Sequence, residues 1–202
     1  TNATNERTVI ASVLPLAGTD FTLRVSIAEI PAKDAALMIA NLNVLVLDFV
    51  CRQKVGGTHL ADYISKQLPI LPPDRYTEAD LAYIVPRVLE LTYTAHDLAG
   101  WAHDLGHNGP PFPFVPERRA QLRAELDAYY ARLYGLTRDE LRYILDPADV
   151  LGDDYPSETF RVLKNKELRE FGEYRTQRLV LAAWDALAAH AVSPPFPAQS
   201  PA

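Results

Sequence analysis

The stretch VCRQKVGGTHLADYISKQLPILPP, residues 50–73, joins an apolar helix to a glycine-broken polar loop and then to an apolar run bounded by prolines. Gly56 and Gly57 carry no Cβ, so they permit a sharp exit from the helix and a close approach of the backbone to a ligand. Hydrogen-bond donors surround the turn: Arg52, Gln53, Lys54, Thr58 and His59. Such side chains suit contacts with base edges and phosphates, although a glycine-capped helix end in solvent is the simpler interpretation.

Two runs upstream of this stretch have the composition of β-strands. Residues 8–14 (TVIASVL) are rich in β-branched side chains, and residues 21–27 (FTLRVSI) alternate apolar with polar side chains, as a half-buried strand does. A turn region over residues 15–20 separates them, so we expect the two strands to pair. Residues 35–54 then predict one long apolar helix that ends at the glycine pair.

Helical patterns follow from Thr77 onward. Three threonines each precede an acidic residue by three positions, which is the capping-box arrangement that marks a helix start. These pairs are Thr77 with Asp80, Thr94 with Asp97, and Thr137 with Glu140. Pro86 predicts a break or kink in the first of these helices, Pro116 suits the first turn of a later one, and Gly172 divides the last helical stretch.

The predicted fold class is therefore α+β and predominantly helical. We expect a small strand–helix half over residues 1–75 and a helical domain over residues 76–192. Residues 193–202 contain too few apolar side chains to pack, so they predict a disordered tail.

Composition limits the classes of function. The chain has 202 residues, 48% of them hydrophobic, and a formal net charge of −6. A free-standing, nonspecific nucleic-acid binder needs clustered Lys and Arg, so any such role here requires a local patch or a larger protein. The one cysteine, Cys51, excludes an intrachain disulfide, and no signal peptide or membrane span is evident, so we expect a cytoplasmic protein without a membrane partner. The chain begins at Thr1 and not at Met; a processed protein is one interpretation, and we expect instead a segment of a longer protein.

Sequence motifs for catalysis are lacking. There is no P-loop, no glycine-rich Rossmann turn and no nucleophile elbow, and Cys51 has no histidine within its segment to act as a base. The spacing of His96, His103 and His107 suggests a metal site as one alternative. One helix offers at most two neighbouring ligands, however, so exposed helix residues are the simpler interpretation. We therefore expect no catalytic, cofactor-binding or metal-binding residue in this chain.

The last helical stretch is locally basic. Its cations are Arg161, Lys164, Lys166, Arg169, Arg175 and Arg178. Glutamates interleave with them, at positions 158, 167, 170 and 173. A salt-bridged surface is the simpler interpretation of this pattern, and a nucleic-acid-binding face is the alternative.

Several motifs, in a fixed order, carry a family resemblance. They are NERT (residues 5–8), RQKVGGTHL (52–60), KQLPILPP (66–73), LELTYTA (89–95), LYGLTRDELRYILDP (133–147) and SETFRVL (157–163). Together they span nearly the whole chain, which resembles the carboxyl-terminal region of adenine-specific DNA methyltransferases of the type IIG restriction-modification and phage-defence kind.

The resemblance implies a division of labour. In the parent enzyme an amino-terminal Rossmann-like domain with an Asn-Pro-Pro-Tyr type motif would hold S-adenosylmethionine and the target adenine, and this chain would be the target-recognition region that follows it. Asn108-Gly109-Pro110-Pro111-Phe112 is not that motif, because Gly109 separates the asparagine from the prolines.

The implied partners are double-stranded DNA and the amino-terminal methyltransferase domain of the same protein. The residues implied at the DNA are Arg7, Arg52, Gln53, Lys54, Gly56, Gly57, Thr58 and His59. The alternative is a helical protein-interaction module that docks a translocase or nuclease subunit and contacts no nucleic acid.

Overall fold

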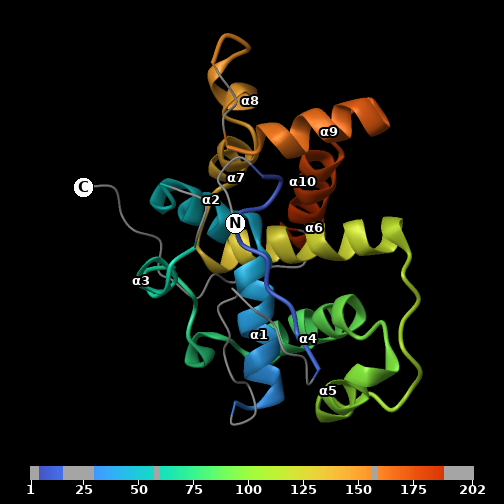
Figure 1. Ribbon diagram of the computed structural model, residues 1–202. Helices are drawn as coiled ribbons and strands as arrows, with labels where there is room; N and C mark the ends of the chain where they lie inside the picture. The colour runs from blue at the N-terminus through green and yellow to red at the C-terminus, as the bar shows by residue number, and fades with distance from the viewer. Residues whose placement is uncertain (1–4, 16–29, 57–59, 156–158, 189–202) are drawn as a thin grey trace.

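The computed structural model describes residues 5–15, 30–56, 60–155 and 159–188, and the secondary structure in these ranges is helical (Figure 1). The α-helices are α1 (Ala32–Asn43), α2 (Leu45–Lys54), α3 (Asp62–Ser65), α4 (Glu78–Thr92), α5 (Ala99–Asp104), α6 (Pro116–Leu133), α7 (Arg138–Leu145), α8 (Pro147–Leu151), α9 (Arg161–Phe171) and α10 (Arg175–Ala188). Two 3₁₀ turns are η1 (Pro73–Arg75) and η2 (His96–Leu98).

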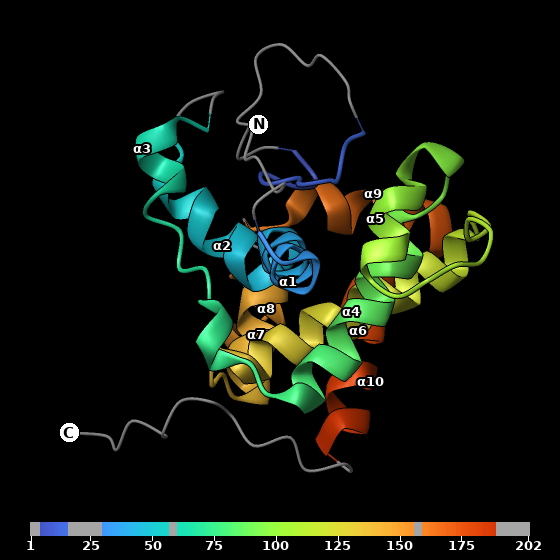
Figure 2. The same cartoon turned by 90° about the horizontal axis from the view of Figure 1, so that it is seen from below.

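Helix α6 lies at the centre of the arrangement. It packs along α10, and α1 packs along α4 (Figures 1 and 2). Arg132 of α6 lies over the Trp184 ring of α10, with its guanidinium carbon 4.3 Å from the ring centroid. One continuous apolar core includes Val9, Leu45, Ile84, Tyr130 and Val180, and so draws on both of the domains expected from sequence. The boundary between residues 75 and 76 stays a prediction, and the tail over residues 193–202 lies outside the described residues.

The α+β fold class predicted from sequence is wrong, because the described part of the chain contains no strand. Residues 8–14 form neither helix nor strand, and several of their backbone groups bind helix side chains. The Thr8 and Val9 amides donate to Asp48 Oδ1 at 2.7 and 2.6 Å. Asn43 accepts from the Ala11 amide at 3.1 Å and donates to the Ala11 carbonyl at 2.9 Å. The second expected strand, residues 21–27, lies outside the described residues.

The long helix predicted over residues 35–54 is two helices. Val44 is extended (φ −83°, ψ 149°) and separates α1 from α2, which are bent by 61°. The freed Leu45 amide donates to Asp127 Oδ1 of α6 at 2.6 Å, so a carboxylate from another helix caps α2. Asp127 Oδ2 lies 3.5 Å from Arg7 Nη2.

No single helix in the described ranges is long and apolar enough to cross a membrane. Helices α1 and α2 meet the length and composition criteria only as a bent pair. The cytoplasmic location expected from sequence stays a prediction.

Local helix signals have mixed outcomes. The capping boxes at Thr77 and Thr137 are confirmed, as are Pro116 in the first turn of α6 and the division at Gly172, whose φ is +73°. The box at Thr94 is wrong, because η2 begins after Ala95 without a side-chain cap. At Pro86, where the sequence predicts a break or a kink, there is no break, since α4 continues through it, and the kink stays a prediction.

Replacement of Asp127 tests the cap that α6 supplies to α2. Asp127→Ala leaves the buried Leu45 amide without its acceptor and should cost about 3 kcal/mol of unfolding free energy in urea denaturation. Asp127→Asn keeps an acceptor oxygen and should cost less. Asp185→Ala, which removes an exposed ion pair with Arg138, is the control and should change stability by less than about 1 kcal/mol. Equal costs for the alanine and asparagine variants would contradict the capping role.

The same residue gives a pH dependence of known sign. Burial raises the pKa of Asp127 above its ordinary value, while Arg7 and the Leu45 amide oppose the shift. Folding therefore favours the protonated acid, and this contribution to stability is present below the unfolded pKa of about 3.9 and is lost as pH rises through the folded pKa. The stability of the wild type relative to Asp127→Asn should fall over that range. A rise would mean that the pair with Arg7 outweighs the burial.

Candidate nucleic-acid interface

The last turn of α2 carries the donors that the sequence singles out. Gln53 and Lys54 are exposed, Val55 leaves the helix in an extended conformation (φ −87°, ψ 102°), and Gly56 is exposed after it. Gly57, Thr58 and His59 lie outside the described residues. Part of the predicted DNA-binding set is therefore accessible at one helix end.

Arg52 has a different environment from its two neighbours. Its side chain is 6% exposed, and its Nε donates to Asp48 Oδ2 at 2.8 Å. Its terminal nitrogens donate to the carbonyls of Thr159 at 2.9 Å, Asn5 at 2.7 Å and Glu6 at 2.9 Å. The guanidinium also lies over the Phe160 ring at 4.7 Å. Arg52 therefore ties α2 to the amino-terminal segment and to the start of α9, and its contact with DNA stays a prediction.

Lys54 lies within a polar projection formed by α2 and α3, which we call the α2–α3 tip. Its exposed members are Gln53, Lys54, Gly56, Tyr63, Lys66 and Gln67. Lys54 Nζ donates to Gln67 Oε1 at 3.5 Å, and Gln67 Nε2 donates to the Tyr63 carbonyl at 2.9 Å. Tyr63 is 68% exposed. Figures 1 and 2 both place α3 at the edge of the molecule.

The charge of the tip differs in sign from that of the chain. Residues 53–67 contain Lys54 and Lys66 against one acid, Asp62, whereas the whole chain has a formal charge of −6. A locally positive projection that also offers amide and phenol groups has the donor set that phosphates and base edges accept.

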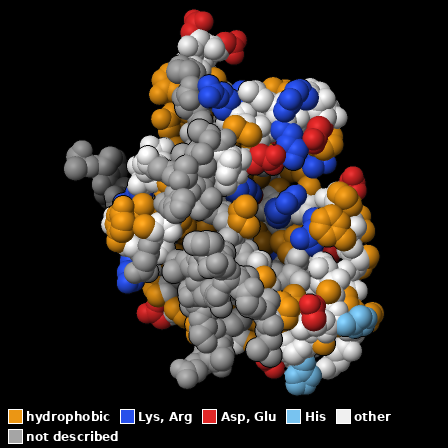
Figure 3. Space-filling model, viewed as in Figure 1, with side chains coloured by type: hydrophobic (Ala, Val, Ile, Leu, Met, Phe, Trp, Pro, Cys, Tyr) orange, Lys and Arg blue, Asp and Glu red, His pale blue; other side chains and the backbone are white. Residues whose placement is uncertain are grey.

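A second group of cations lies elsewhere, around two adjoining cavities. Arg7 and Arg123 line both cavities. The smaller, of about 190 Å³, lies between residues of the amino-terminal segment, α6, α9 and α10. The larger, of about 370 Å³, is mainly apolar and is lined by the amino-terminal segment, α1, α4 and α6. Figure 3 shows Lys and Arg side chains beside hydrophobic ones around a hollow on this face.

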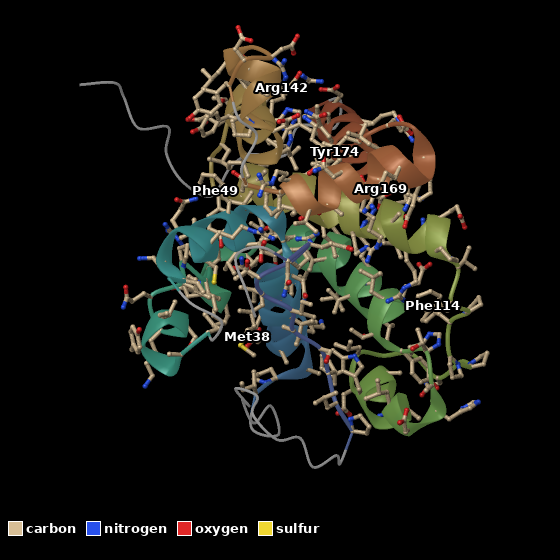
Figure 4. The ribbon with its side chains drawn as sticks, turned by 45° about the horizontal axis from the view of Figure 1, so that its top comes forward. Met38, Phe49, Phe114, Arg142, Arg169 and Tyr174 are labelled. Atoms are coloured by element: carbon tan, nitrogen blue, oxygen red, sulfur yellow. The ribbon has the colours of Figure 1, made fainter. Side chains whose placement is uncertain are left out.

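The remaining cations of the last two helices are largely paired, as a salt-bridged surface predicts. Lys164 pairs with Asp146, Lys166 with Glu6 at 3.0 Å, and Arg178 with Glu173 at 2.8 Å. Figure 4 shows Arg169 on α9, and its Nε donates to the Asn165 carbonyl at 3.2 Å.

The other side chains considered for chemistry occupy ordinary environments. Burial raises the pKa of the Cys51 thiol to about 11, which leaves it protonated at neutral pH. His96 and His103 are exposed, and His107 stacks on Phe112 with ring centroids 4.9 Å apart. Across the described ranges, no three His, Cys, Asp or Glu side chains are grouped closely enough to hold a metal ion.

Comparisons of the chain with protein-family models, curated proteins and solved structures find no match.

Sequence reasoning missed the arginines of α6. Arg119 and Arg123 are four residues apart on one helix, a spacing that places both on the same face and that was visible in the sequence PERRAQLRAE, residues 116–125. In the fold these two arginines lie near Arg7 and Arg175, which come from two other parts of the chain. This proximity depends on the tertiary structure and cannot be predicted from the sequence.

Substitution at Arg52 should lower the unfolding free energy much more than substitution at Lys54. Arg52→Lys keeps a positive charge but loses the planar fork that reaches several carbonyls, so it should lower the unfolding free energy by about 2 kcal/mol. Lys54→Ala, two residues later on the exposed side, should change it by less than about 0.5 kcal/mol. Chemical denaturation of both variants measures this contrast. If Arg52→Lys is as stable as the wild type, the structural assignment of Arg52 is wrong.

Proposed function

We propose that this chain is the DNA-contacting carboxyl-terminal region of an adenine-specific DNA methyltransferase of the type IIG restriction-modification or phage-defence kind. The ordered sequence motifs support the class of enzyme. The observation that carries the DNA-binding role is the α2–α3 tip, an exposed and locally positive group of donors on an otherwise acidic chain.

The tip residues have distinct parts in this proposal. Lys54 and Lys66 neutralise backbone phosphates, and these contacts position the duplex without reading its sequence. Gln53 offers the carboxamide that pairs in a bidentate manner with an adenine edge in the major groove. The backbone at Gly56 is open to a ligand, since a Cβ built there would meet nothing within 4 Å.

Methyl transfer belongs to another part of the proposed enzyme. The S-adenosylmethionine and the flipped adenine would bind in the amino-terminal methyltransferase domain, while this region grips the duplex.

A second candidate function is docking of a protein subunit without DNA contact. Exposed apolar residues in α8 and in the segment that follows it favour this function. Val150, Leu151 and Tyr155 are 40%, 54% and 42% exposed. A docking module would lose partner binding on substitution of these residues and would bind duplex DNA no better than a tip variant does.

Duplex binding by the full chain at low salt tests the proposal. The double variant Lys54→Ala and Lys66→Ala should weaken binding of a fluorescent duplex, measured by anisotropy, and should reduce the slope of log affinity against log salt by about 2.

The matched control is Arg138→Ala, which removes an exposed cation from a surface pair with Asp185. It should leave both the affinity and the salt slope near their wild-type values. A double tip variant that binds duplex as the wild type does, with the same slope, would overturn the DNA-binding role.

A further inference from the structure

The smaller cavity gathers guanidinium groups from separate elements. Arg7 comes from the amino-terminal segment, Arg123 from α6 and Arg175 from the first position of α10. Figure 4 places Tyr174, the residue before Arg175, beside α9. We call this cavity, with Arg7, Arg123 and Arg175 in its wall, the arginine cleft.

Most carboxylates around the cleft are already engaged. Glu6 pairs with Lys166 at 3.0 Å, and both oxygens of Glu167 accept from Thr176, at 2.6 and 2.7 Å. Asp127 accepts from the Leu45 amide and faces Arg7. The exposed Glu170 is the remaining acid of the wall.

Two of the guanidinium groups, those of Arg123 and Arg175, have hydrogen-bond donors without a partner in the described part of the chain. Among the residues that the structure describes, Arg123 forms no hydrogen bond or ion pair, although it is exposed and lines the cavity. Arg175 lies over the Phe171 ring at 3.8 Å, and its buried Nε has no hydrogen-bond partner in the described part of the chain. An unpaired buried donor carries a free-energy cost that a bound acceptor removes.

The charges around Arg123 also favour a bound anion. Partial loss of hydration lowers the pKa of Arg123, and the nearby charges of Arg7, Arg119 and Arg175 add to this effect against Asp127 alone. Since a guanidinium stays protonated in proteins, the cations repel one another, and a bound anion would relieve that repulsion.

We propose that the arginine cleft binds a phosphate group, held by Arg123 and Arg175. The planar guanidinium fork matches the oxygens of a phosphate, and two such groups that line one cavity of about 190 Å³ can donate to one tetrahedral anion. The phosphate comes either from a nucleic-acid backbone or from a free phosphate compound. This site uses none of the tip residues, so it does not depend on the proposed function.

Calorimetric titration of the full chain with inorganic phosphate, against sodium chloride of equal ionic strength, tests the site. The wild type should bind phosphate, and Arg123→Ala should raise the dissociation constant about tenfold or more. Arg123 is accessible, so its replacement should leave the fold intact, as circular dichroism can check. Arg178→Ala removes a surface cation paired with Glu173 and should retain phosphate binding.

Duplex binding distinguishes the two sources of the phosphate. A backbone phosphate predicts that Arg123→Ala also weakens duplex binding and that inorganic phosphate competes with the duplex. A free phosphate compound predicts unchanged duplex binding. In both cases the double variant of Lys54 and Lys66 should bind inorganic phosphate as the wild type does, which separates this site from the tip.

Two results would overturn the phosphate site. One is a wild-type chain that binds no more phosphate than chloride. The other is an Arg123→Ala variant that retains wild-type phosphate affinity.

Discussion

The ion pair between Asp48 and Arg52 holds together parts of the chain that lie far apart in sequence. A buried charge is tolerated only when it is paired and hydrogen-bonded, and both partners meet that condition. Asp48 accepts from the Thr8 and Val9 amides, while Arg52 donates to carbonyls of two segments that are distant in sequence, at Asn5 and at Thr159. The two residues are one turn apart on α2, so a single helix face carries the whole junction.

The burial of Arg52 in this junction determines which side chains at the end of α2 face solvent. Consecutive helix residues point about 100° apart, so the inward direction of Arg52 turns Gln53 and Lys54 toward solvent. The structural and the proposed DNA-contacting residues are therefore neighbours in sequence with opposite orientations. The arginine cleft is lined by residues of the amino-terminal segment, α6, α9 and α10, and by none of α2 or α3, so the two proposed anion-contacting surfaces share no residue.

Local signals allowed much of the helical part to be predicted from sequence. The capping boxes at Thr77 and Thr137 and the glycine at 172 act within one turn, so their residues alone are sufficient. The strand over residues 8–14 was mispredicted because backbone groups at Thr8 and Ala11 are bound by the side chains of Asp48 and Asn43, about 30 to 40 positions away. The bend at Val44 likewise depends on Asp127 of α6. Within the site, the exposure of Gln53 and Lys54 fits the sequence interpretation, whereas the burial of Arg52 and the convergence of four arginines depend on contacts that no local pattern encodes.

Amide hydrogen exchange at Thr8 and Val9 tests the central junction most directly. Both residues are buried and lie outside any helix or strand, so only a side-chain acceptor explains slow exchange there. We expect both amides to be protected in the wild type, at a level similar to amides within α2, and to lose that protection in Asp48→Ala while the amides of α10 keep theirs. Fast exchange at Thr8 and Val9 in the wild type, or protection that persists in Asp48→Ala, would contradict the account.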